Sequence, residues 1–358
     1  MPGSRNRRQQ QRQQPATRTP HLPAQPPPAP ELPASVDVAP ASDPSNDEKA
    51  ELEALITKLE EARNSRVVVY WTSPIARIAD PVVLPLYDQL SAIGKVDRLD
   101  LFLQTGGGDT EMPWRIVSLI RDYCEHFGVI VPHRAASSGT LLALGANEIV
   151  MTPLSVLGPI DPSRSHPLLP RREGQQEAEP ISVQDMRHAM KFINDAAGED
   201  KNYTPEAMAQ IFSALFDKIH PLVIGAIEQS YALSKLIGTR CLETHMTGDD
   251  AEDKIKKIVD TLCDDFKSHA YQIPRREAEK IGLNVKNANE AEESAITDLL
   301  KFYLKRPFMP AEHPKPKQQF KHRSAWLDST QLHMAVEGTS LIDDDGGFRP
   351  LADKWVVY

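Results

Sequence analysis

The chain has 358 residues, a net charge of −9 at pH 7 and three cysteines. This length allows one large domain or two modest ones with a real hydrophobic core, and the mild acidity argues against nucleic acid as the main partner. The cysteines are far apart with no C-x-x-C pair, so we expect neither a disulfide framework nor a cysteine metal site.

Two further absences in the sequence bear on location. No apolar run approaches the roughly 20 residues that span a bilayer. No signal-peptide pattern follows Met1. We therefore expect a cytoplasmic protein without a transmembrane segment, for which peripheral membrane association stays open.

The N-terminal part divides into a tail and a helix. Residues 1–45 combine arginines, a glutamine-rich patch and a Pro-Ala stretch, which predicts a disordered tail with polyproline character. Residues 46–64 contain an amphipathic helix, Asn46 to Arg63, because its apolar residues follow the i, i+3, i+4, i+7 spacing: Leu52, Leu55, Ile56 and Leu59. We expect this helix to pack on the domain or on a second subunit.

Residues 65–308 form the expected domain, which begins with strands that alternate with helices. The alternation predicts an α/β fold, with a parallel sheet of repeated βαβ units. Functional sites form at the C-terminal ends of such strands. The expected strands lie at residues 67–71, 98–104, 129–131, 148–151 and 155–158.

The second half of this domain is helical and is expected to cover the sheet. Helices are predicted from Ser182, Thr204 and Pro221 and over residues 249–266. The polar segment 159–180 is either a flap over the site or a disordered insertion. Residues 309–358 are expected to be a linker, over 309–324, followed by a C-terminal extension with a small β element.

The most informative stretch is the serine turn, residues 135–140, between a β-branched run and an apolar helix. Free N–H groups at a helix N-terminus favour a nucleophile and its oxyanion there. The alternative is that Ser137, Ser138 and Thr140 merely cap the helix. The glycine run 106–108, which we call the glycine turn, follows the preceding strand. With the N–H of Gly139 it could form an oxyanion hole.

These segments resemble a known family. The residues 105–108, 136–151 and 157–162 look like the serine dehydrogenase proteinase family of the ClpP/crotonase superfamily, to which the SppA peptidases are related. The similarity is strongest over residues 66–162 and extends to Gly282-Leu283, so it implies a ClpP/crotonase-like fold. It also implies a nucleophile at Ser138 and oxyanion donors at Gly107 and Gly108.

The sequence departs from the family pattern in three places. Gly106 replaces a usual proline. Ser137 precedes the expected nucleophile, so either serine is a formal candidate, and position favours Ser138. Asp161 stands near the place of the ClpP histidine base, and a carboxylate is a poor base for a serine hydroxyl. We therefore expect Asp161 to orient a neighbour and the base to come from elsewhere.

Four residues are candidates for that base. His269 ranks first because it lies near the place of the ClpP triad acid. Lys191 ranks second, since serine–lysine relatives keep a lysine broadly there. His166, in the flap-like loop, ranks third. His220 precedes Pro221, where a capping role is favoured.

The resemblance implies a homo-oligomeric ClpP/SppA-like serine endopeptidase that hydrolyses peptide or protein substrates through an acyl-enzyme on Ser138. No P-loop or metal-ligand cluster appears, so no cofactor is expected. Two alternatives stay open: a crotonase-like enzyme of acyl-CoA thioesters, and a non-catalytic assembly or binding protein.

Overall fold

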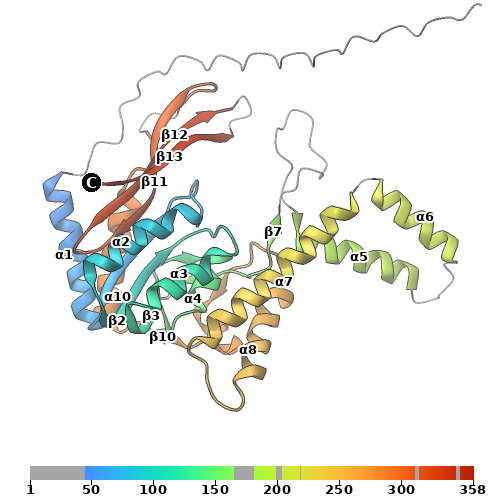
Figure 1. Cartoon of the computed structure of the whole chain (residues 1–358), viewed down its shortest axis with the longest axis horizontal. Helices are drawn as coiled ribbons and strands as arrows, with labels where there is room; N and C mark the ends of the chain where they lie inside the picture. Colours follow the sequence, from blue (N-terminus) through green and yellow to red (C-terminus); the bar gives the residue numbers. More distant parts are fainter. Residues whose placement is uncertain (1–44, 165–180, 199–203, 218, 311–313, 344–346) are drawn as a thin grey trace, which may run out of the picture. The chain divides into compact units, whose positions relative to one another are not determined.

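The computed structural model describes residues 45–164, 181–198, 204–217, 219–310, 314–343 and 347–358 (Figure 1). The expected tail and most of the flap-like segment lie outside these ranges. All described residues belong to one compact unit, Ser35–Tyr358.

An eight-stranded sheet forms the centre, in the order β10-β5-β3-β2-β1-β11-β12-β13. The first five of these strands are parallel, which confirms the predicted α/β fold. The last three extend the sheet beyond β1, and each is antiparallel to the strand before it in this order. The bounds are β10 (Val285–Asn287), β5 (Glu148–Met151), β3 (Cys124–Val131), β2 (Val96–Gln104), β1 (Arg66–Thr72), β11 (Gln319–Asp328), β12 (His333–Ile342) and β13 (Phe348–Val357).

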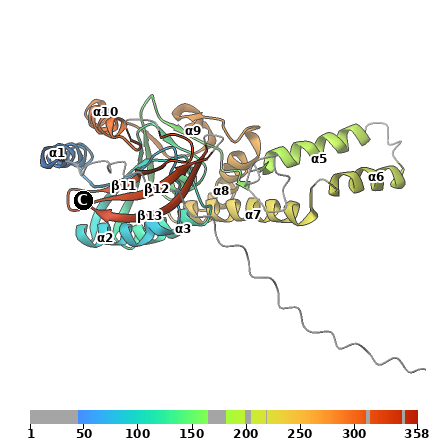
Figure 2. The same ribbon diagram turned by 90° about the horizontal axis from the view of Figure 1, so that it is seen from above.

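Helices cover both faces of the sheet (Figure 2). One face packs on α2 (Val83–Ile93), α3 (Met112–Arg121), α4 (Ser138–Ala143), α7 (Pro221–Glu243) and α8 (Ala251–Asp260). The other packs on α1 (Asn46–Arg63) and α10 (Glu290–Lys305). Successive residues of β1 alternate between the two cores, as the period of a strand requires. Because both faces of β1 are buried, residues 67–71 of this strand form a continuous apolar run.

A small sheet lies at the edge where the site forms. It joins β4 (Arg134–Ala135), β6 (Val156–Leu157) and β9 (Ile273–Pro274). The strand expected at 155–158 is therefore β6, outside the main sheet. The remaining elements are η1 (Asp80–Val82), β7 (Ser163–Arg164), β8 (Ile181–Ser182), α5 (Val183–Gly198), α6 (Pro205–Phe216), η2 (Thr261–Asp265) and α9 (Arg275–Ile281).

The C-terminal segment is more regular than the sequence suggests. β11 begins at Gln319, inside the stretch expected to be a linker, and pairs directly with β1. The expected small β element is three long strands, because antiparallel pairing with β1 extends the central sheet. In the part of the chain described here, no single helix is long and apolar enough to cross a membrane. One bent pair, Ala209–Phe216 with Pro221–Glu243, meets those criteria together.

Candidate active site

The glycine turn follows β2 and is held from one side by the loop after β1. Ile78 donates its N–H to the carbonyl of Gly107 at 2.9 Å and accepts from the N–H of Asp109 at 2.8 Å. Gly107 has φ 107°, which favours glycine. Its N–H donates to the Thr105 hydroxyl at 3.0 Å. Gly107 is therefore not a free oxyanion donor, contrary to the expectation. The N–H of Gly108 makes no hydrogen bond with any described residue.

The serine turn has one strained residue, Ser137, with φ 53° and ψ −115°. A non-glycine residue at positive φ is uncommon, and such strain is concentrated at functional sites. Ser137 is half-buried. Within the described ranges its hydroxyl has no hydrogen-bond partner, so this oxygen is free to meet a substrate.

The neighbouring serine differs. Ser138 is only 1% exposed, and its hydroxyl donates to the carbonyl of Gly108 at 2.6 Å. The hydroxyl expected to be the nucleophile is therefore buried and engaged. It ties the serine turn to the glycine turn.

The backbone N–H groups of the serine turn also differ from the expectation. Gly139 donates its N–H to the carbonyl of Ala136 at 2.8 Å, so it is not a free oxyanion donor. Glycine is required there because a Cβ would lie 2.4 Å from Cγ2 of Thr105. The N–H of Ser138, the first residue of α4, has no partner among the described residues. The sequence interpretation missed this donor, although the rule that first-turn N–H groups are free could have found it.

The free N–H groups of Gly108 and Ser138 come from two turns that touch each other. A Cβ added at Gly107 would lie 3.4 Å from the Ser138 nitrogen and 2.9 Å from Cβ of Ser137. Two backbone donors beside a free hydroxyl are what an oxyanion hole needs.

The structure brings together the first-ranked base and the expected orienting residue. Nδ1 of His269 lies 3.0 Å from Oδ1 of Asp161, which is fully buried, while the His269 side chain is 34% exposed. The hydrogen bond that the His269 ring makes to the Asp161 carboxylate is the main cause that raises the pKa of His269 above its usual value, against the effect of burial. Nε2 of His269 makes no hydrogen bond within the described part of the chain.

The small sheet joins the segments that carry this pair to the segment that carries the serine turn. β4 leads into Ser137, β6 leads toward Asp161, and β9 follows His269. A Cβ at Gly158 would lie 3.4 Å from the nitrogen of Ser137. The charge of Arg134 opposes protonation of His269. No hydrogen bond joins His269 to either serine among the residues described, and catalytic hydrogen bonds are often long without substrate.

The other candidate bases do not join this group. Nζ of Lys191 pairs with Asp195 at 2.6 Å on the surface of α5, with its side chain 70% exposed. Nδ1 of His220 accepts from the N–H of Leu222 at 3.2 Å, which confirms the expected capping role. His166 lies outside the described residues.

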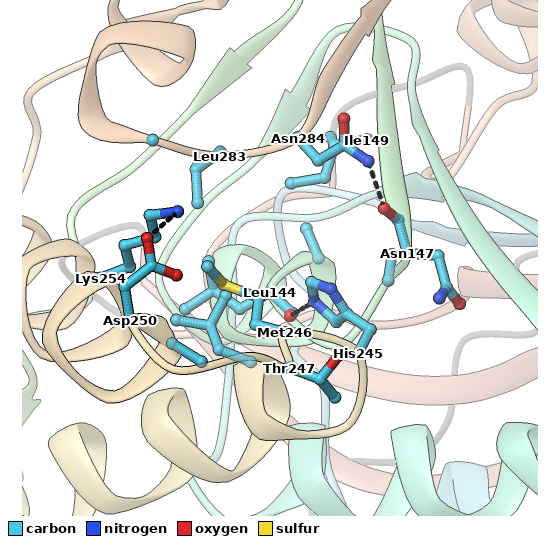
Figure 3. A pocket seen from close by; sticks show the side chains of 15 residues that line it. Leu144, Asn147, Ile149, His245, Met246, Thr247, Asp250, Lys254, Leu283 and Asn284 are labelled. Carbon is cyan, nitrogen blue, oxygen red and sulfur yellow. Dashed lines mark hydrogen bonds and ion pairs between the residues drawn. The ribbon is translucent and has the colours of Figure 1, made fainter.

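A separate pocket of about 320 Å³ lies at the opposite end of α4 (Figure 3). Two of its polar side chains bond to backbone carbonyls: His245 to that of Leu144 at 2.9 Å, and Asn284 to that of Asn147 at 2.6 Å. None of the residues that line it belongs to the serine turn. The described residues contain no group of three or more side chains that could hold a metal ion.

Known proteins resemble the chain to different extents. It is 26% identical over 214 residues to an uncharacterised protein of Methanocaldococcus jannaschii, covering 60% of this chain and 61% of that protein. It is 39% identical over 64 residues to a second one from the same organism, covering 18% and 22%. The chain thus spans less than two thirds of either relative.

Two solved structures are similar at 18% identity, and both are point mutants of the membrane-bound stomatin-specific protease 1510-N. The first has a TM-score of 0.34, covering 66% of this chain and 84% of that one. The second is in complex with a substrate peptide and has a TM-score of 0.33, covering 64% and 78%.

Residues 86–194 match the model of a protein family described as ClpP-like SDH-type serine proteinases. This segment contains the glycine turn, the serine turn and Asp161. The match confirms, over these residues, the resemblance inferred from the motifs.

Proposed function

We propose that the protein is a serine peptidase that cleaves peptide bonds through an acyl-enzyme on Ser137. This assignment replaces Ser138, the residue favoured by position. The observation that carries it is the contrast between the two adjacent hydroxyls. That of Ser137 is half-buried and unpaired among the described residues, while that of Ser138 is bonded to the Gly108 carbonyl.

In the proposed first step, Oγ of Ser137 forms a bond to the scissile carbonyl carbon, and its proton passes to Nε2 of His269. The bond between Nδ1 of His269 and Asp161 fixes the ring and stabilises its protonated form. The carbonyl oxygen becomes an oxyanion, which accepts from the N–H groups of Gly108 and Ser138.

In the proposed second step, the carbon–nitrogen bond breaks and His269 returns its proton to the leaving amine. The peptide's acyl group stays on Ser137 as an ester. Water then attacks this ester with His269 again as base, and the carboxylate product leaves as Ser137 regains its proton.

The alternative of a non-catalytic assembly protein rested on the missing histidine at Asp161. His269 supplies a histidine bonded to that same carboxylate, so this argument loses its force. An acyl-CoA enzyme would use the same oxyanion donors without a nucleophile, and only activity can separate it from a peptidase.

The test is turnover of a mixture of fluorogenic peptides by the full chain and two variants. We expect Ser137→Ala to lose about 1,000-fold or more in kcat, while Ser138→Ala keeps measurable turnover. Thermal unfolding checks that each variant is folded. Loss on Ser138→Ala with full activity in Ser137→Ala would assign the nucleophile to Ser138. Wild-type acyl-CoA turnover that Ser137→Ala does not change would favour the thioester alternative.

A further inference from the structure

A cavity of about 400 Å³ lies between the loop after β1 and the C-terminal strands. Ala76, Arg77 and Ala79 line it from the loop. β11, β12 and β13 supply the opposite side. Its apolar lining includes Tyr70, Val82, Val336, Phe348 and Trp355. The C-terminal strands that complete the cavity lie outside the segment that matches the family, residues 86–194.

The loop that lines this cavity is the same loop that holds the glycine turn. Ile78, between the lining residues Arg77 and Ala79, makes both backbone bonds to that turn. The approach is so close that a Cβ at Gly108 would lie 2.1 Å from the Ile78 carbonyl oxygen. The cavity therefore neighbours the N–H group proposed to hold the oxyanion.

The start of the loop, directly after β1, is fixed to the C-terminal strands. The N–H of Ser73 donates to the carbonyl of Ser324, on β11, at 2.8 Å. One short loop thus joins the wall of the cavity to the glycine turn. The loop therefore contacts the glycine turn through Ile78 and the cavity through the neighbouring residues Arg77 and Ala79.

The chemistry of the cavity favours an uncharged, apolar occupant. Burial lowers the pKa of His322, which lines the cavity, so its ring is neutral near pH 7. Its Nε2 is 2.9 Å from the hydroxyl of Ser340, which also lines the cavity. The charged lining residues are of both signs, Arg77, Asp353 and Lys354, so neither sign of ligand charge is favoured. The aromatic and aliphatic walls gain contact from an apolar ligand.

We propose that this cavity is a specificity subsite, which takes an apolar side chain of the peptide substrate. An extended peptide advances about 3.3 Å per residue. When the scissile carbonyl of the peptide lies at Gly108, a peptide residue two to four positions from the scissile bond reaches past the loop that contains Ile78. This inference rests on the proposed peptidase function and adds to it the substrate class: peptides with an apolar residue at one fixed distance from the cleaved bond.

The experiment uses a peptide that the full chain cleaves, with the scissile bond located by mass spectrometry. At each position two to four residues from that bond, leucine is replaced by asparagine, which has a similar shape. We expect kcat/KM to fall about tenfold or more at one position. The other positions should change little.

Two matched valine variants then connect that position to the cavity. Val336→Trp fills the cavity, and Val357→Trp, on the neighbouring strand with 64% of the residue exposed, is the control. We expect Val336→Trp to abolish the discrimination between leucine and asparagine, while Val357→Trp keeps it. Discrimination that survives in Val336→Trp overturns the subsite.

A second variant covers the case in which tryptophan disturbs the fold. Phe348→Ala enlarges the cavity, and we expect it to shift the preference at the same position from leucine toward tryptophan. An unchanged preference contradicts the proposal.

Labelling of Ser137 by a fluorophosphonate separates this inference from the proposed function. Wild-type protein that is labelled and cleaves peptides without any apolar preference refutes the subsite alone. Wild-type protein that is neither labelled nor active refutes the peptidase and the subsite together.

Discussion

Two histidine–aspartate pairs in the described part of the chain look alike, but they differ in whether the second ring nitrogen of the histidine has a partner. Nδ1 of His269 lies 3.0 Å from Asp161, and Nδ1 of His333 lies 3.3 Å from Asp328. Both aspartates are fully buried. The second ring nitrogen of His333 is occupied by Glu53 of α1 at 3.2 Å, whereas that of His269 has no partner among the described residues.

This difference separates a structural pair from a catalytic one. A general base needs a nitrogen that can take a proton from the nucleophile. Both ring nitrogens of His333 are engaged, one by Asp328 of β11 and the other by Glu53 of α1, and its side chain is only 9% exposed. The His269 side chain is 34% exposed. A histidine beside a buried aspartate is therefore not sufficient evidence for a catalytic role. The second ring nitrogen, Nε2, must also be without another partner.

The largest effect that would sharpen this comparison is expected from His269→Ala. Without the base, kcat should fall by about 1,000-fold, within the usual range for general base catalysis. His333→Ala is the matched control and should stay within about twofold of wild type, because its nitrogens are engaged elsewhere. Steady-state peptide hydrolysis measures both, and equal losses in the two variants would erase the distinction.

The next effect concerns pH and is expected from Asp161→Asn. Asp161 is the main cause that raises the pKa of His269, and the base works only when neutral. Wild-type activity should therefore rise with pH, and the midpoint of this rising limb of the pH–rate profile should lie above the usual histidine pKa of about 6.5. In Asp161→Asn the limb should move to lower pH, and kcat should fall about 100-fold or more because the ring loses its orientation.

The control for that shift is Asp328→Asn, in the other pair. It should leave the limb of the pH–rate profile in place. A limb that moves in Asp328→Asn, or stays in Asp161→Asn, would contradict the assignment of His269 as base.

A smaller effect is expected from Ser138→Ala. The buried hydroxyl donates to the Gly108 carbonyl at 2.6 Å and thereby positions the glycine turn. Its loss should lower kcat about tenfold with little change in KM, because a misplaced oxyanion donor acts on the transition state. Equal affinity of a peptide boronate for wild type and Ser138→Ala would argue against this role.

The smallest effect on activity, and a measurable one on stability, is expected from His333→Ala. Removal of one partner from this buried network should cost about 1–3 kcal/mol of unfolding free energy. Burial lowers the pKa of His333, but its bonds to Asp328 and Glu53 outweigh this, so the net shift is upward. The contribution is therefore full below about pH 6.5 and declines as pH rises through the folded-state pKa.

Urea unfolding at several pH values measures this contribution. The difference in stability between wild type and His333→Ala should shrink from acidic to alkaline pH. A difference that grows with pH would contradict the direction of the shift.

Local patterns in the sequence predicted much of this molecule. The helix Asn46–Arg63 was predicted with its observed bounds, since its apolar period is regular. The glycine and serine turns were found from their small residues. That the N–H groups of Gly107 and Gly139 are engaged was not predictable, because their acceptors, Thr105 and the Ala136 carbonyl, are positioned by the tertiary structure.

Long-range pairs were only partly predictable. Asp161 and His269 lie 108 residues apart, and the sequence suggested each one separately with no evidence of contact. The C-terminal strands were underestimated, because β13 is largely exposed and lacks the apolar alternation of a half-buried strand.

The most direct test of the central claim is the position of a fluorophosphonate adduct in wild-type protein. Tandem mass spectrometry of the peptide that contains both serines locates the phosphonylated hydroxyl. We predict the adduct on Ser137, with labelling lost in Ser137→Ala and retained in Ser138→Ala. An adduct on Ser138, or none on either serine in folded and peptide-cleaving protein, would contradict the account.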